Sequence, residues 1–104
     1  MTTLEVLRGA RAKIAQGWCQ GASARDADGQ LTGVTQPDAC CWCAIGAVYA
    51  AAPLEPDSGD AAFEYLARVT PGHLIGTWND DPSRTQAEVL ALFDRAIAQQ
   101  ERAA

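Results

Sequence analysis

The longest apolar run in the chain, Cys40–Ala52, limits most strongly what the chain can fold into. The run carries no charged side chain and ends at Pro53. Pro37 precedes it and suits the first turn of a helix, because the N–H that proline lacks would have no partner there. A helix that is apolar on every side is normally buried at the centre of its domain. We therefore predict a central helix through Cys40–Ala52, with Gly46 and Ala47 small enough for another helix to cross closely.

Two capping boxes predict the first and last helices. Thr2 with Glu5, and Thr85 with Glu88, have the spacing at which each side chain satisfies the free backbone N–H of the other residue. Gly17 is placed to end the first helix, since glycine tolerates a left-handed turn. Apolar residues recur at helical spacing after each box. They are Leu4, Leu7, Ala10, Ile14 and Trp18 in the first helix, and Val89, Leu90, Leu92, Phe93, Ala96 and Ile97 in the last.

The segments between these helices are shorter. A third helix, capped by Asp57 or Ser58, is predicted up to the Pro71-Gly72 break, and His73–Trp78 could form one more helical turn. After the first helix, Asp28-Gly29 favours a tight hairpin turn, but its flanks are weak strand formers. A small β-hairpin and an ordered loop are both open at that place. The third helix would bury Ala62, Phe63, Leu66 and Ala67.

Together these elements predict a mainly α fold. We expect a compact four- or five-helix single domain over residues 1–104, with a small β-hairpin or ordered loop after the first helix. The length of 104 residues suits one domain, since domains most often have ~100–150 residues. The Cys40–Ala52 helix would be surrounded by the first, third and last helices.

Charge and hydropathy exclude several function classes. The net charge of −5 argues against a nucleic-acid binder, which needs cations to displace counterions from phosphates. No stretch approaches the ~20 apolar residues that a membrane span needs. The first residues do not form a signal peptide, because Glu5, Arg8, Arg11 and Lys13 interrupt their apolar pattern. We therefore expect a cytoplasmic protein whose four cysteines are reduced thiols.

The cysteines include one C-x-x-C pair, Cys40 and Cys43, together with Cys19 and Cys41. Zinc favours four thiolate or imidazole ligands, commonly as two short-spaced pairs, but here a single pair is supplemented only by an isolated Cys19 and a distant His73. Inside an apolar helix the thiol pKa rises, which disfavours the thiolate that a metal needs. A thioredoxin-like pair follows a strand, and none is predicted before Cys40. We expect structural thiols, no metal and no cofactor.

A cysteine-dependent enzyme or thiol sensor is the alternative. Cys43, His73 and either Asn79 or Asp80 occur in the order nucleophile, base and orienting group that papain-like hydrolases use. Such a nucleophile needs an exposed helix start and an activating base, whereas Cys43 lies within an apolar run. The sequence therefore predicts no catalytic residue, and Cys43, His73 and Asp80 are kept as the alternative set.

The polar loop from Trp78 to Arg84 is the most distinctive segment outside the predicted helices. Asn79 and Asp80 can shape a turn by bonding to local backbone, and Arg84 can pair with Asp80 or Asp81, which would make the loop a structural corner. The alternative is a shallow recognition site, because tryptophan and arginine commonly anchor binding surfaces. Its candidate residues are Trp18, Arg25, Asp26, Trp78, Asn79, Asp80 and Arg84.

Three groups of residues span nearly the whole chain in a fixed order. They are Gly17-Trp18 with Ala24–Asp26, Trp42–Ala47, and Trp78–Asp80 with Arg84-Thr85 and Glu88–Leu90. With these segments the chain resembles an uncharacterised family of small bacterial and bacteriophage proteins that has no assigned activity, substrate or cofactor. The resemblance implies a single domain and a setting in mobile elements, and it assigns no catalytic residue. The residues outside the matching segments include Cys19, Cys40, Cys41 and His73.

From these observations we expect a non-enzymatic binding or accessory module that acts on a protein partner in a bacterial or phage setting. The expectation rests on the resemblance and on the lack of a credible catalytic constellation. Self-association is also open, since the last helix could expose part of its apolar stripe to a second copy.

Overall fold

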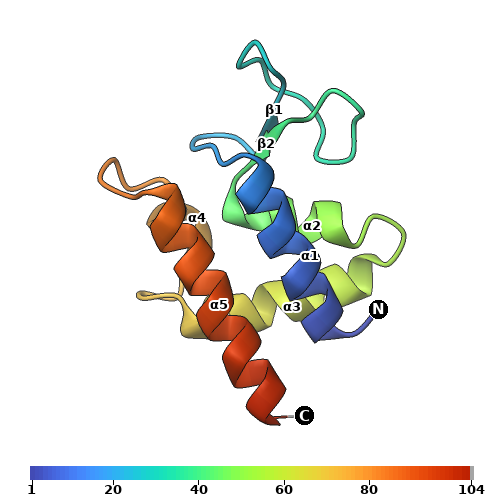
Figure 1. The fold of residues 1–104 in the computed structure, drawn as a ribbon, viewed down its shortest axis with the longest axis vertical. Helices are drawn as coiled ribbons and strands as arrows, with labels where there is room; N and C mark the ends of the chain where they lie inside the picture. The colour runs from blue at the N-terminus through green and yellow to red at the C-terminus, as the bar shows by residue number, and fades with distance from the viewer. Residues whose placement is uncertain (104) are drawn as a thin grey trace.

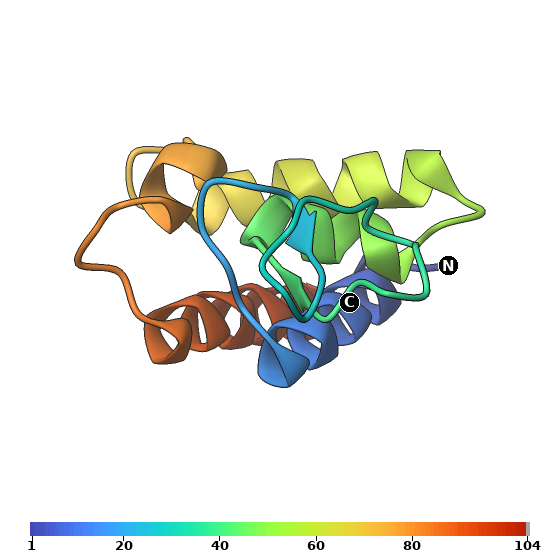
Figure 2. The same ribbon diagram turned by 90° about the horizontal axis from the view of Figure 1, so that it is seen from above.

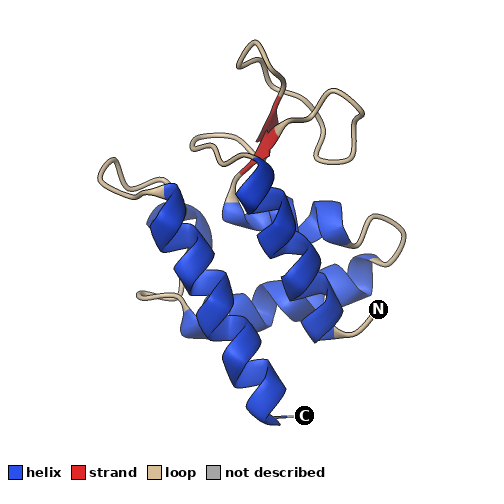
Figure 3. Cartoon of the chain, in the orientation of Figure 1, coloured by secondary structure: helices blue, strands red, loops and turns tan. Residues whose placement is uncertain are grey.

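The structure is a computed structural model, and it describes residues 1–103. Within these residues the chain forms five helices and one small antiparallel sheet (Figure 1, Figure 3). The predicted mainly α fold, with a small β-hairpin or ordered loop after the first helix, is confirmed, and the structure has the hairpin. None of the described helices is long and apolar enough to cross a membrane. The elements are α1 Thr3–Gln16, β1 Ala24–Arg25, β2 Cys41–Trp42, α2 Ala44–Ala51, α3 Pro56–Val69, α4 Ile75–Asn79 and α5 Gln86–Ala103.

The helices form two layers, which Figure 2 shows from above. α1 and α5 lie side by side in one layer, α3 and α4 lie in the other, and α2 packs against both α1 and α3. α1 contacts α2, α3 and α5, whereas α2 makes no comparable contact with α5. The prediction that the Cys40–Ala52 helix is surrounded by the first, third and last helices is therefore wrong. With eight residues, α2 is only about 12 Å long, too short to reach every neighbour.

The core lies between the two layers and is built from the apolar stripes of the long helices. Leu7 and Ile14 of α1, Leu66 of α3, and Leu92 and Phe93 of α5 are each at most 1% exposed. Helical periodicity predicted all of these positions, because the buried face of a surface helix repeats every three to four residues. The stripes of the long helices therefore bury the sides that the sequence assigned to them.

Both predicted capping boxes are present. The N–H of Glu5 donates to Thr2 Oγ1 over 3.1 Å, and the N–H of Thr2 donates to Glu5 Oε1 over 2.8 Å. At the start of α5, the N–H of Glu88 donates to Thr85 Oγ1 over 3.2 Å and the N–H of Thr85 donates to Glu88 Oε1 over 2.9 Å. These bonds satisfy backbone N–H groups that have no partner inside the helix.

Gly17 ends α1 as predicted, but for a different physical reason. Its φ is −178°, an extended conformation that any residue can adopt, so no left-handed turn is needed. A Cβ at this position would lie 2.2 Å from the carbonyl oxygen of Cys40 and 3.0 Å from Cys41 Cβ. Glycine is therefore required because β2 passes directly against the end of α1.

The apolar run begins as a strand and becomes helical only at Ala44, so the predicted helix start near Pro37 is wrong. Cys41 and Trp42 pair with β1 on one side. On the other side, the N–H of Trp42 donates to Gly17 O and its carbonyl accepts from the N–H of Cys19, each over 3.1 Å. These long-range bonds hold the segment in an extended conformation, which local helix propensity cannot overcome.

The predicted hairpin turn at Asp28-Gly29 is present. The N–H of Asp26 donates to Gln30 O over 2.9 Å, and Gly29 has a positive φ of 79°. An isolated antiparallel bridge joins Arg25 to Leu31 across this turn. The ladder partner of β1 is nevertheless β2, which lies much further along the chain.

α3 begins at Pro56, earlier than its predicted caps Asp57 and Ser58. Pro56 occupies the first turn, where the missing N–H costs nothing. Glu55 stands at the cap, but its side chain accepts from the Met1 ammonium over 2.6 Å and makes no capping bond. The Ser58 hydroxyl donates to Met1 O over 3.1 Å. The proposed cap is wrong because proline already fixes the start of this helix.

The closest backbone approach in the core gives a first testable prediction. A Cβ on Gly46 of α2 would lie 2.0 Å from Ser23 O, so the loop before β1, and not a second helix, crosses here. We expect Gly46→Ala to lower the free energy of unfolding by about 3 kcal/mol, since backbone must shift to make room. Urea denaturation followed by circular dichroism measures this change.

Gly76→Ala in α4 is the matched control. A Cβ there would lie 3.5 Å from Ile45 Cδ1, an ordinary contact. Alanine also favours the helix by up to ~1 kcal/mol, so the stability should be unchanged or slightly raised. Equal losses in both variants would contradict the packing described at Gly46.

Candidate functional site

Asn79 is the centre of the polar corner that the sequence singled out. Its side chain is fully buried at the end of α4. The Oδ1 atom accepts from Trp18 Nε1 over 2.9 Å and from the N–H of Ala44 over 3.0 Å. The Nδ2 atom donates to Cys19 O over 3.2 Å and to Asp80 Oδ1 over 2.9 Å. All hydrogen-bonding capacity of the amide is thereby used, and it joins α4 to the loop after α1 and to the start of α2.

Asp80 and Gln20 extend this network to the surface. Asp80 is exposed, yet its Oδ1 also accepts the N–H of Gly21 over 3.0 Å. Gln20 Nε2 donates to the carbonyls of Asn79 and Asp81, over 2.9 and 2.7 Å. The loop after α1 is therefore fastened to the loop after α4 by side-chain bonds to backbone.

Trp78 and Arg84 form a second contact in this corner. The Arg84 guanidinium lies 3.9 Å from the centroid of the Trp78 ring, and its Nε donates to Trp78 O over 2.9 Å. Arg84 forms its ion pair with Glu88, at 3.2 Å, instead of with the predicted Asp80 or Asp81. The reason is the α5 capping box, which already holds Glu88 one helical turn beyond Arg84.

The structure brings together five of the seven predicted recognition residues. Asn79 bonds to Trp18 and Asp80, and Arg84 packs on Trp78. The other two lie on the β1 side of the same loop: Arg25 donates to Gln20 O and Gly29 O, while Asp26 Oδ1 accepts from the N–H groups of Asp28 and Gln30 in its own turn. These hydrogen bonds fix the conformation of the loops, as expected for a structural corner. The recognition role of these seven residues stays a prediction.

Cys43 is a buried cap, which is a different placement from the predicted helix interior. Its Sγ accepts the N–H of Gly46 over 3.3 Å at the start of α2. Burial raises the pKa of the Cys43 thiol, although the backbone N–H groups of Gly46 and Ile45 partly offset the rise. At neutral pH the side chain is therefore a protonated thiol, which is a poor nucleophile.

The other thiols lie around β2: Cys41 belongs to the strand, Cys40 directly precedes it, and the N–H of Cys19 donates to Trp42 O. Burial, followed by the neighbouring Cys41 thiol, raises the pKa of Cys19 to about 12. Cys40 is exposed and Cys41 half-buried. The prediction that Cys40 lies inside a helix is wrong, because it precedes β2 and α2 begins only at Ala44. Within residues 1–103, no three His, Cys, Asp or Glu side chains gather where they could hold a metal ion.

His73 forms its hydrogen bond with backbone and not with a thiol. It has a positive φ of 62° in the turn between α3 and α4, and its ring Nδ1 lies 3.1 Å from Ala67 O. In residues 1–103, no hydrogen bond or ion pair joins Cys43, His73 and Asp80 to one another. The geometry therefore lends no support to the alternative catalytic set.

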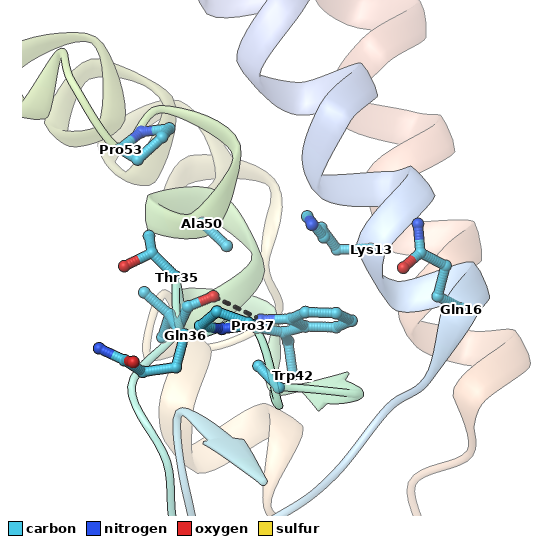
Figure 4. A pocket seen from close by; sticks show the side chains of 10 residues that line it. Lys13, Gln16, Thr35, Gln36, Pro37, Trp42, Ala50 and Pro53 are labelled. Carbon is cyan, nitrogen blue, oxygen red and sulfur yellow. Dashed lines mark hydrogen bonds between the residues drawn. The ribbon is translucent and has the colours of Figure 1, made fainter. Parts of the chain in front are cut away.

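A cleft that the sequence did not indicate opens on another part of the molecule. Its volume is about 390 Å³, and it lies between the last turn of α1, the loop 34–39 and the end of α2 (Figure 4). Its floor is the indole of Trp42, which is 3% exposed. Trp42 Nε1 donates to Val34 O over 2.9 Å and so ties the loop to β2. The polar residues that line it are Lys13, Gln16, Thr35 and Gln36.

Among the described residues, Lys13 supplies the only charge in this cleft. Its Nζ lies 4.8 Å from the centroid of the Trp42 ring, a cation–π contact. In the described part of the chain Lys13 forms no ion pair, whereas Arg8, Arg11 and Arg84 each pair with a carboxylate. The cleft escaped sequence analysis because three segments far apart in the chain form it. The one available signal was that Lys13 is the single lysine.

Comparison with known proteins yields one match. The model of a family of unknown function, DUF6197, matches residues 1–99 of the chain. No curated protein and no solved structure matches it. Site assignments therefore rest on the geometry of this molecule alone.

The Asn79 network gives a second prediction. Replacing Asn79 with Ala leaves the N–H of Ala44 and the carbonyl of Cys19 without that partner, and unsatisfied buried groups cost about 1–3 kcal/mol. We expect Asn79→Ala to lower the free energy of unfolding by about 3 kcal/mol in urea denaturation. Thr77→Ala, an exposed change on the same short helix, is the control and should stay within about 0.5 kcal/mol of the parent.

Thiol labelling tests the role of Cys43. At pH 7 we expect iodoacetamide to modify Cys40 first in the native protein and to reach Cys19 and Cys43 only after unfolding, because their raised pKa values keep them protonated and burial hides them. Peptide mass mapping identifies each site, and labelling in denaturant provides the reference for all four thiols. Rapid native modification of Cys43 would instead favour the enzyme or sensor alternative.

Proposed function

The chain belongs to the family of unknown function DUF6197, and we propose that it is a non-enzymatic binding module that engages a protein partner through the cleft over Trp42. We place the module in the cytoplasm of a bacterial or phage-infected cell. The observation that carries the proposal is the Lys13 ammonium, which faces the cleft without an ion-pair partner in the described residues.

Lys13 is half-buried and forms no ion pair within the described residues. Acidic groups outnumber Lys and Arg by 13 to 8, and carboxylates already pair with three of the arginines. A half-buried cation that stays unpaired in an acidic protein is available to a group from outside. The position of Lys13 serves binding better than stability, because the cation–π contact alone contributes only about 1 kcal/mol.

The other polar groups support binding over catalysis. Cys43 caps α2, Asn79 uses its full bonding capacity inside the corner, and His73 bonds to the end of α3. A nucleophile and base within hydrogen-bond reach of each other are the signature of covalent catalysis, and these three side chains have partners of other kinds. The cleft therefore offers recognition groups without a reactive pair beside them.

The shape and surroundings of the cleft favour a protein over a small molecule. One wall is an exposed loop that carries Thr35, Gln36 and Pro37. Leu54, which is 92% exposed, follows the lining residue Pro53 and adds apolar surface beyond the cleft. Exposed apolar and polar groups around a recessed anchor point are the usual composition of a protein interface.

Site-specific photocrosslinking tests this proposal. We would replace Gln36 in the cleft, or Glu64 on the exposed side of α3 as control, with a benzophenone amino acid and irradiate cells of the native host. We expect a crosslinked protein from position 36 and none from position 64, identified by mass spectrometry. A second copy of the chain at position 36 would make the partner a homodimer. Equal products at both positions, or none at position 36, would refute partner binding at the cleft.

A further inference from the structure

The inference concerns which chemical group of the partner enters the cleft, and it rests on the proposed function. We propose that the cleft accepts an acidic side chain of the partner protein, with its carboxylate on Lys13 and its methylene stem against Pro37 and Pro53. Figure 4 shows Lys13 and Gln16 on one side of the Trp42 ring and Thr35, Gln36 and Pro37 on the other.

The charge in the cleft fits one negative group. Within residues 1–103, Lys13 is the single charged residue that lines the cleft, and no carboxylate lines it. A lysine ammonium acts as a compact point charge with three donors, and no arginine fork is present in the lining to bind a phosphate by two parallel bonds. A monoanion is matched by this cation, whereas a phosphate dianion would leave one charge without a partner.

Neutral donors surround the charged one. Gln16, Thr35 and Gln36 line the cleft from two sides, and none of their side chains hydrogen-bonds to another part of the described chain. Amide N–H₂ and hydroxyl groups can donate to a carboxylate oxygen, which has up to four lone-pair sites for the two oxygens together. The lining side chains can therefore donate hydrogen bonds to a carboxylate without breaking a hydrogen bond within the protein.

The apolar part of the lining fits a short hydrocarbon stem. Val34, Pro37 and Pro53 contribute it, and the rigid prolines lose little conformational entropy when a partner binds. The volume of about 390 Å³ lies near the lower end of the range for binding pockets. A single glutamate side chain is therefore a better match than a large cofactor.

The experiment is an NMR titration of the ¹⁵N-labelled full chain with two capped peptides, acetyl-Ala-Glu-Ala-amide and acetyl-Ala-Gln-Ala-amide. The Nε1–H resonance of Trp42 is the reporter, because this indole forms the floor of the cleft. An isolated side chain of this size should bind with a Kd of about 1 mM. We expect the Glu peptide to bind at least ten-fold more tightly than the Gln peptide.

Variants test whether the Lys13 ammonium causes the preference for the Glu peptide. Lys13→Gln should abolish the preference for the Glu peptide, Lys13→Arg should retain part of it, and Arg68→Gln on exposed α3 should leave it unchanged while altering the net charge equally. The shift dispersion of each spectrum shows whether the variant is folded. The peptide comparison in the parent protein needs no variant at all.

Three results would overturn the inference. They are equal affinities for the two peptides, an undiminished preference in folded Lys13→Gln, and free 3-methylbutanoate binding ten-fold more tightly than the Glu peptide, which would assign the cleft to a small acid. Crosslinking at position 36 without any preference for the Glu peptide would support the proposed binding module and refute only the acidic ligand. A preference for the Glu peptide without a crosslinked protein would refute the protein partner and support only carboxylate binding in the cleft.

Discussion

The buried side chain of Asn79 joins three segments that lie far apart in the chain. Its buried amide joins the end of α4, the loop after α1 and the first N–H of α2. In a medium of low dielectric constant each of these bonds is stronger than in water, and each would be costly to leave unmade. The full use of all donors and acceptors explains why one orientation of these loops is favoured. The fold depends on this residue because α2, β2 and α4 are too short to be stable by themselves.

The same corner indirectly fixes the cleft. Asn79 binds the N–H of Ala44, the first residue of α2. Trp42 lies two residues earlier, at the end of β2. The position of the Trp42 indole is therefore fixed by β2 and by the start of α2. The indole then holds the loop 34–39 through Val34 O, and its ring face attracts Lys13 from α1. A change in the corner would therefore be transmitted to the cleft through one continuous stretch of backbone, β2.

What could be predicted from the sequence was local in character. The boxes at Thr2 and Thr85 and the turn at Asp28-Gly29 need only neighbours in the chain, and each is present. The apolar run from Cys40 could not be divided correctly, because an apolar run satisfies a buried strand as well as a helix. The choice is made by Ala24 and Gly17, which pair with Trp42 from far along the chain. Cys43 was missed as a cap because thiols seldom hold that position.

An acidic molecule would at first sight repel the acidic side chain that we assign to the cleft. The net charge of −5 is spread over the surface, however, and interactions between exposed charges fade beyond about 8 Å at physiological ionic strength. The Lys13 ammonium acts at contact distance beside a buried ring, where screening is much weaker. Electrostatic repulsion would therefore slow the association of the partner mainly at low salt. The stability of the complex depends instead on the nearby Lys13 ammonium. Trp42 contributes to this local effect, since its ring holds the ammonium in place before the carboxylate arrives.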